Sequence, residues 1–315
     1  MTTITAELSA PLLIDGAMST ALEQLGADTN NPLWTASVLA KQPELVKRVH
    51  QEYFTAGAQL AITDTYQANV PAFIANGYSA RQAHQLIRRA VILAKEARDE
   101  YQQKTGIYNY VAGALGPYGA YLADGSEYTG DYHLSTAEYK QFHRPRLTDI
   151  LSVGVDVIAI ETQPRLDEVL AELELVKELS PTTLCYVSFS LKDRTALADG
   201  TPLAVAARIV AKYHNVFAVG INCIPLEEVT PAVEVIHRVT AKPVIAYPNS
   251  SAIYDPQTKT WTYPHGQRSL SNYLPQWLAA GLTIVGGCCT TTPRDIALLH
   301  EHLTEITGKE LNNHD

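Results

Sequence analysis

Short apolar runs alternate with longer amphipathic segments along the whole chain. Eight apolar runs, most of them rich in β-branched residues, predict buried strands over residues 12–15, 59–65, 110–115, 155–161, 184–190, 216–223, 243–247 and 282–287. The segments between them have helical spacing, over residues 44–56, 80–104, 136–152, 166–179, 202–213, 226–238, 270–280 and 293–306. In the fourth of these, one apolar stripe that can cover a sheet is formed by Leu166, Val169, Leu170, Leu173 and Val176.

Eight strand-then-helix units with nearly unbroken apolar strands are typical of a parallel sheet that is buried on both faces. We therefore expect one domain over residues 1–315, an α/β fold of the (β/α)8 or TIM-barrel type. The main alternative is a doubly wound open sheet. A Gly-x-Gly-x-x-Gly turn after the first strand would favour that alternative, and residues 15–19 (Asp-Gly-Ala-Met-Ser) do not form one.

Two connections are longer than ordinary loops, residues 116–135 after the third strand and residues 248–269 after the seventh. Both are rich in aromatic residues, namely Tyr118, Tyr121, Tyr128, Tyr132, Tyr254, Trp261 and Tyr263. This composition argues against disorder and predicts that the two loops form a lid over the barrel mouth. The alternative is that these side chains only pack on one another.

Polar and sulfur-bearing residues gather at the carboxyl ends of the predicted strands, where TIM barrels place their active sites. The residues at these ends include Asp15, Thr65, Glu161, Asn222, Cys223, Cys288 and Cys289. Cys185 falls inside the fifth strand, and we expect it to be a small packed side chain.

Cys223, Cys288 and Cys289 follow the sixth and eighth strands, whose ends lie roughly 10 Å apart on one rim at the usual strand spacing. Three cysteine ligands leave the fourth position of a zinc ion open, as in catalytic zinc sites. Thr292-Pro293 predicts a helix start close to the cysteine pair. Spacing alone leaves two alternatives open: three buried apolar cysteines, or a vicinal disulfide between Cys288 and Cys289.

Composition and charge restrict the classes of partner. Of the 315 residues 46% are hydrophobic and 18% are charged, and the formal net charge is −9. This acidic balance argues against nucleic acid and anionic membranes as partners. No signal peptide or membrane-spanning run is evident, so we expect a cytoplasmic protein, a monomer or a small homo-oligomer. Four cysteines, two of them adjacent, make a poor disulfide framework.

Residues 286–293 (Gly-Gly-Cys-Cys-Thr-Thr-Thr-Pro), together with residues 220–223 (Gly-Ile-Asn-Cys), resemble the motif pair that carries zinc in the homocysteine S-methyltransferase family. Further matches cover nearly the whole chain, at residues 15–18, 65–68, 116–121, 124–128, 161–162 and 247–250. The chain is most similar to the single-domain branch that uses S-methylmethionine or S-adenosylmethionine. Thr290, where the family often has Arg, and residues 251–252, where it often has Gly-Glu, depart from the pattern and bear on donor preference.

The resemblance implies roles for particular residues. Cys223, Cys288 and Cys289 fall on the ligands of one zinc ion per chain, while Asp15 and Glu161 fall on the acidic residues that hold the substrate's amino group. It also implies that substrate is contacted by Gly16, Ala17, Thr65 and Asn222. Without the resemblance, Asp15 and Glu161 would equally be read as helix caps or as partners of a barrel arginine.

The predicted reaction is attack of a zinc-bound homocysteine thiolate on the methyl group of a sulfonium donor, which gives methionine. One alternative is a thiol or selenol methyltransferase that takes its methyl group from betaine or another donor. A non-catalytic zinc or thiol sensor is the alternative from a different class. An assay of methionine formation with S-methylmethionine, S-adenosylmethionine and betaine discriminates between them.

Overall fold

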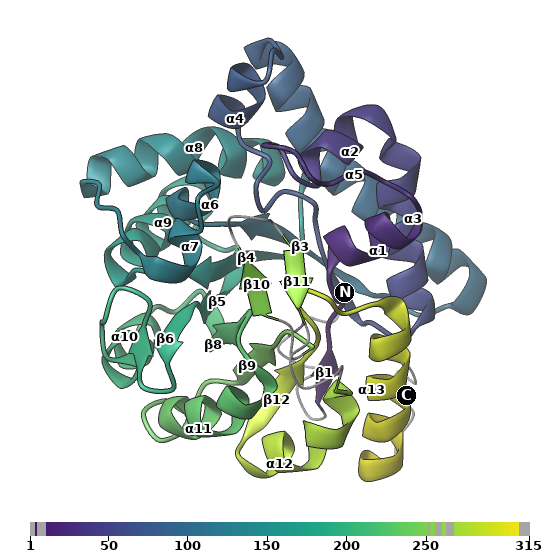
Figure 1. The fold of residues 1–315 in the computed structure, drawn as a ribbon, viewed down its shortest axis with the longest axis vertical. Coiled ribbons are helices and arrows are strands. Elements are labelled where there is room, and N and C mark those ends of the chain that lie inside the picture. Colours follow the sequence, from purple (N-terminus) through teal and green to yellow (C-terminus); the bar gives the residue numbers. More distant parts are fainter. Residues whose placement is uncertain (1–3, 5–10, 251–252, 256–259, 263–267, 309–315) are drawn as a thin grey trace.

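Eight parallel strands occupy the centre of the molecule and helices surround them (Figure 1). The computed structural model describes residues 4, 11–250, 253–255, 260–262 and 268–308. In chain order the strands are β1 (Leu12–Leu13), β2 (Leu60–Ile62), β3 (Tyr110–Leu115), β4 (Val157–Gln163), β5 (Leu184–Phe189), β8 (Val216–Asn222), β9 (Val244–Tyr247) and β12 (Leu282–Val285). Each lies within one of the predicted strands or overlaps it closely.

The order of the strands is that of a barrel. The sheet runs β1-β12-β9-β8-β5-β4-β3-β2, and a parallel bridge between Ile14 and Leu60 joins its two ends. Backbone hydrogen bonds continue across this seam, from the Asp15 amide to the Leu60 carbonyl at 3.0 Å and from the Gln59 amide to the Leu13 carbonyl at 2.8 Å. The (β/α)8 prediction is therefore confirmed, and the open doubly wound alternative is wrong.

Helices follow the strands where the sequence predicts them. They are α3 (Pro43–Thr55), α5 (Ala80–Thr105), α8 (Thr136–Val153), α9 (Leu166–Leu179), α10 (Leu203–Val210), α11 (Leu226–His237), the 3-10 turn η2 (Leu270–Tyr273) continued by α12 (Leu274–Ala279), and α13 (Pro293–Thr307). The start of α13 is fixed as predicted, because the Asp295 carboxylate accepts hydrogen bonds from the amide and the hydroxyl of Thr292. No described helix is long and apolar enough to cross a membrane.

Shorter elements lie in the connections, and the sequence did not predict them. They are α1 (Met18–Gln24), α2 (Ala36–Lys41), α4 (Val70–Ala75), α6 (Tyr118–Leu122), α7 (Ser126–Thr129), and the hairpins β6 (Leu191–Asp193) with β7 (Ala196–Leu197) and β10 (Ile253–Asp255) with β11 (Thr260–Thr262). The connection 116–135 thus contains α6 and α7. Much of the connection 248–269 lies outside the described residues, so its role as a lid stays a prediction.

The apolar residues form two main layers because parallel strands are buried on both faces. Side chains inside the barrel, among them Leu12, Tyr186 and Ile284, make one cluster. The opposite faces of the strands pack against the helices in a larger cluster, which includes Val187 and Trp277. The packed interior leaves the carboxyl ends of the strands as the place for a site.

Candidate active site

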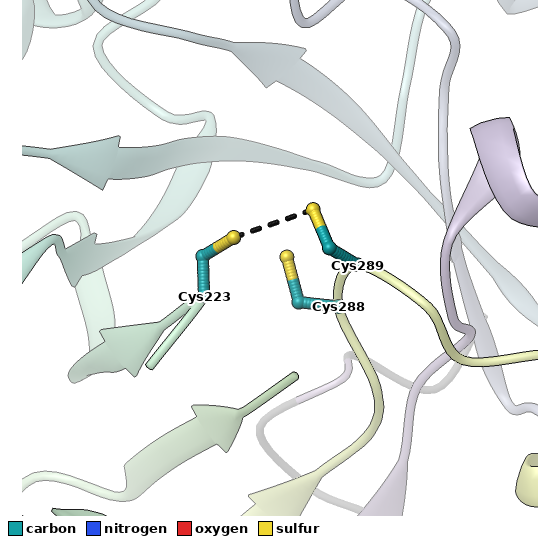
Figure 2. Close-up of side chains that lie close together, drawn as sticks. All are labelled: Cys223, Cys288 and Cys289. Atoms are coloured by element: carbon teal, nitrogen blue, oxygen red, sulfur yellow. Dashed lines mark hydrogen bonds between the residues drawn. The ribbon is translucent and has the colours of Figure 1, made fainter. Parts of the chain in front are cut away.

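The three predicted cysteines converge at the carboxyl ends of the strands. Cys223 follows β8, and Cys288 and Cys289 lie in the connection from β12 to α13; Figure 2 shows their side chains pointing toward one another. The three sulfur atoms all lie within 4.8 Å of one another, with 3.4 Å between those of Cys223 and Cys289. All four cysteines are free, which excludes the vicinal disulfide in this structure. Cys185 is fully buried in β5, as predicted.

Hydrogen bonds to neighbouring strand ends hold the backbone of these cysteines. The Cys223 amide donates to the Tyr247 carbonyl at 3.0 Å, and the Cys288 amide donates to the Pro248 carbonyl at 2.8 Å. Cys223 has a φ of 56°, and Thr290, just after the cysteine pair, has a φ of 67°. Left-handed backbone costs a residue with a Cβ about 1–2 kcal/mol, and such conformations concentrate at functional sites.

Polar groups surround the sulfur atoms and set their protonation. The hydroxyl of Tyr128, from α7, lies 3.2 Å from the Cys223 sulfur. Hydrogen bonds from the thiols of Cys288 and Cys289 lower the pKa of Cys223 well below its usual value. The hydrogen bonds that Cys288 makes with Cys223 and with Cys289 raise the pKa of Cys288 well above its usual value. A donor set of three converging thiols fits a thiophilic metal ion, and this fit argues against three merely packed cysteines.

Asp15 and Glu161 are both buried. Glu161 lines the pocket that contains the cysteines, and Asp15 directly precedes Gly16, which also lines it. The Ile62 amide donates to one oxygen of Asp15 at 2.8 Å, and the other oxygen accepts no hydrogen bond from a described residue. Tyr247 donates its hydroxyl to Glu161 at 3.0 Å. Burial raises the pKa of the Asp15 carboxyl well above its usual value and that of Glu161 to about 8. A buried carboxylate without a cationic partner is costly, so the binding of a cationic ligand stabilises the ionised form of both carboxyl groups.

Neither carboxylate caps the helix that follows it. Ala17 and Arg165 stand at the N-cap positions of α1 and α9, and neither helix has a side-chain cap hydrogen bond. The nearby guanidinium of Arg146 lowers the pKa of Glu161 by its charge, but its hydrogen bonds go to the carbonyl oxygens of Thr65, Tyr66 and Gly116 and to His143.

The other predicted contact residues divide into two groups. Gly16, Ala17 and Asn222 line the pocket. A Cβ on Gly16 would lie 2.7 Å from the Thr291 hydroxyl oxygen, so glycine lets the turn after β1 approach the cysteine loop closely. Thr65 is fully buried but is not among the described lining residues; its hydroxyl donates to the Ala114 carbonyl of β3 at 2.8 Å. Contact between Thr65 and substrate stays a prediction.

Several of the residues that line the pocket were not predicted from the sequence. They are Met18, Ser19, Trp34, Thr35, Ile62, Thr63, Asp64, Tyr66, Tyr128, Thr162, Tyr247 and Gly287. Asp64 and Tyr66 flank Thr65 at the end of the predicted second strand, and this position is the signal that could have identified them. Trp34 and Thr35 precede a six-residue helix, α2, whose apolar period is too short to recognise.

A buried polar network fixes the connection that carries Tyr128. Glu168 of α9 accepts hydrogen bonds from the Tyr118 amide at 2.6 Å, the Tyr132 hydroxyl at 2.5 Å and the His143 ring at 2.8 Å. Burial lowers the pKa of His143, so its ring is neutral at pH 7 and donates one hydrogen bond while it accepts another from Arg146. The loop tyrosines therefore differ in role: Tyr118 and Tyr132 pack on each other, whereas Tyr128 reaches the sulfur cluster.

Comparison with known proteins agrees with this site. The family model described as homocysteine S-methyltransferase matches residues 12–303. The homocysteine S-methyltransferase of Escherichia coli (strain K12) is 47% identical over 91% of this chain and 94% of its own, and that of Bacillus subtilis (strain 168) is 43% identical over 90% and 92%. A crystal structure of the homocysteine methyltransferase MmuM from Escherichia coli in its metallated form superposes with a TM-score of 0.84 at 45% identity, covering 92% of this chain and 96% of that chain. The chain belongs to the homocysteine S-methyltransferase family.

Proposed function

We propose that this protein transfers a methyl group from a sulfonium donor, S-methylmethionine or S-adenosylmethionine, to the thiol of homocysteine. Cys223, Cys288 and Cys289 would hold one zinc ion per chain. The observation that carries the proposal is the convergence of three free thiols within 4.8 Å, in a pocket whose lining includes the buried carboxylates of Glu161 and Asp64. Neither carboxylate forms an ion pair with a described basic residue. Three sulfur ligands suit zinc and leave one position for a substrate.

Coordination to zinc supplies a deprotonated, nucleophilic sulfur at neutral pH, where a free thiol is mostly protonated. The carboxylates of Asp15 and Glu161 bind the ammonium group of homocysteine and thereby orient its sulfur toward the cysteines. Asn222 positions the floor of the site, because its side chain bonds the Thr162 amide at 2.9 Å and the Ser188 hydroxyl at 2.8 Å.

The transfer itself needs no proton donor. The homocysteine sulfur forms a bond to the methyl carbon while the bond from that carbon to the donor sulfur breaks, and its electron pair stays on the donor sulfur. The donor loses its positive charge and leaves as a neutral thioether. The protein's contribution is therefore to orient the two sulfurs and to exclude water.

The metal and the sulfur count test this proposal together. We expect about one zinc per chain in the wild type and loss of zinc in Cys288→Ser, which leaves only two thiolates. Cys185→Ser is the matched control and should keep its zinc. X-ray absorption at the zinc edge should count three sulfur ligands without substrate and four with homocysteine.

Methionine formation with S-methylmethionine, S-adenosylmethionine and betaine, each at equal concentration, then identifies the donor. Activity in metal-free wild type, or four sulfurs before substrate is added, would overturn the proposal. Turnover with betaine alone would keep the fold and the metal but refute the sulfonium chemistry.

A further inference from the structure

A carboxylate with no role in the proposed homocysteine site also lines the pocket. Asp64 follows β2 and is 5% exposed. The Thr35 hydroxyl donates to one of its oxygens at 2.5 Å. The other oxygen is buried and accepts no hydrogen bond from a described residue. A buried carboxylate oxygen without a donor is expensive, so its presence in a pocket points to a ligand that supplies the donor.

Burial is the main influence on the protonation of Asp64. Burial raises its pKa to about 7, and the Thr35 hydrogen bond opposes this shift. The charge of Glu161 contributes to the raised pKa of Asp15, and the charge of Cys223 contributes to that of Glu161, whereas neither contributes at Asp64. The pocket lining therefore contains a second buried carboxylate besides Glu161, and its only hydrogen-bond partner among the described residues is Thr35.

The segment that holds Asp64 in place, residues 34–37, departs from the usual geometry of a helix start. Thr35 is the N-cap residue of α2, but its hydroxyl makes no capping bond and goes to Asp64 instead. Trp34, the residue before it, has a φ of 50°, a left-handed conformation that is rare for a bulky residue. The Ser37 hydroxyl holds this conformation by donating to the Trp34 carbonyl at 2.8 Å. A helix start without its side-chain cap and a bulky residue in left-handed backbone are locally unfavourable, and such features concentrate at functional sites.

Aromatic rings also line the pocket. Trp34 and Tyr66 both line it, with ring centroids 6.2 Å apart in an edge-to-face arrangement. A carboxylate next to aromatic faces is a combination that binds organic cations. The methyl donors considered above are cations at two points, the sulfonium and the α-ammonium group.

We propose that Asp64, positioned by Thr35 and flanked by Trp34, binds the α-ammonium group of the methyl donor and so restricts donors to sulfonium amino acids. This inference rests on the proposed function. Homocysteine must place its sulfur at the cysteines, and the donor sulfonium must meet that sulfur from the opposite side. A short methylene chain separates the donor's ammonium from its sulfonium, so the ammonium lies farther from the cysteines than the sulfonium does. Betaine has no N–H donor for Asp64, and its carboxylate would be repelled.

The test pairs a change in the protein with a change in the donor. Asp64→Asn keeps the size of the side chain and an oxygen for Thr35 but removes the charge. With homocysteine saturating, we expect it to raise the KM for S-methylmethionine about tenfold to one hundredfold. The KM for homocysteine should stay within about twofold of wild type. Thr35→Val, which removes only the hydrogen bond that positions Asp64, should raise the donor KM in the same direction by a smaller factor, roughly threefold to tenfold.

The change in the donor is made with the deamino analogue of S-methylmethionine, 4-(dimethylsulfonio)butanoate, which lacks the ammonium group. Its Kd, measured by competition calorimetry on the zinc-loaded chain, should be weaker for the wild type than that of S-methylmethionine and should not weaken further in Asp64→Asn. Thermal unfolding and zinc content of both variants report whether the fold and the metal site are kept.

An unchanged donor KM in Asp64→Asn, an equal loss for the deamino analogue, or a rise in the homocysteine KM alone would overturn the assignment. If the wild type itself formed no methionine from either sulfonium donor, the proposed function would have failed. Even then, comparison of the calorimetric Kd for S-methylmethionine between wild type and Asp64→Asn would test whether Asp64 binds its ammonium group.

Discussion

His50 gives the stability of this protein a pH dependence that can be calculated. The side chain lies on α3, is fully buried, and neither ring nitrogen has a hydrogen-bond partner among the described residues. Burial lowers its pKa from 6.5 to about 4. Between these two values the unfolded chain binds more protons than the folded chain, so the free energy of unfolding falls as the pH falls.

The magnitude follows from the two pKa values. The difference between a pKa of 6.5 in the unfolded chain and about 4 in the folded chain corresponds to about 3.4 kcal/mol, lost progressively from about pH 6.5 to about pH 4. At pH 5 the linkage relation gives a loss of about 2 kcal/mol relative to pH 7.5. His50→Leu removes the titrating group at similar volume, and its free energy of unfolding should lack this loss.

The assay is urea unfolding of wild type and variant at pH 7.5 and pH 5.0. Asp64 and Glu161 have raised pKa values and act in the opposite direction, so the test is the difference between the two proteins and not the wild-type curve alone. His214, which is exposed, provides the control: His214→Leu should follow wild type at both pH values. If His50→Leu loses the same free energy as wild type between the two pH values, His50 is not a buried neutral histidine and the reasoning is refuted.

Two further predictions concern the site and its support. Asp15→Asn and Glu161→Gln should each weaken homocysteine binding by about 1.5–3 kcal/mol, because each removes a charge-assisted hydrogen bond to the ammonium. The KM for homocysteine should rise while the zinc content stays unchanged, and no change in KM or kcat in either variant would make these carboxylates structural. Glu168→Gln should lower the free energy of unfolding, measured by urea titration, by about 2–3 kcal/mol, because three donors converge on the buried carboxylate. A loss below roughly 0.5 kcal/mol would show that this network contributes little to stability.

The barrel was predictable because its strands are buried on both faces and its longer helices carry a full apolar stripe. Periodicity needs several turns, so it could not reveal α6 and α7, which have five and four residues. The convergence of the three cysteines was predictable because strand ends in a barrel face one rim. The contact between Asp64 and Thr35 joins positions 29 residues apart that only the tertiary fold brings together. At Thr65, position at a strand end does not reveal the side-chain partner: its hydroxyl donates to the Ala114 carbonyl of the neighbouring strand.

The left-handed backbone at Cys223 and Thr290 recurs at Thr162, which has a φ of 56° just after Glu161. A protein engineer who optimised this sequence for thermal tolerance alone would place glycine at all three positions, since glycine adopts this conformation without steric cost. Such a redesign would remove one of the three converging thiols at Cys223 and would add backbone freedom to the turns at Thr162 and Thr290. At Cys223 the cost of left-handed backbone can therefore be relieved only by giving up the cysteine cluster, so a search for heat-resistant variants should leave this position unchanged.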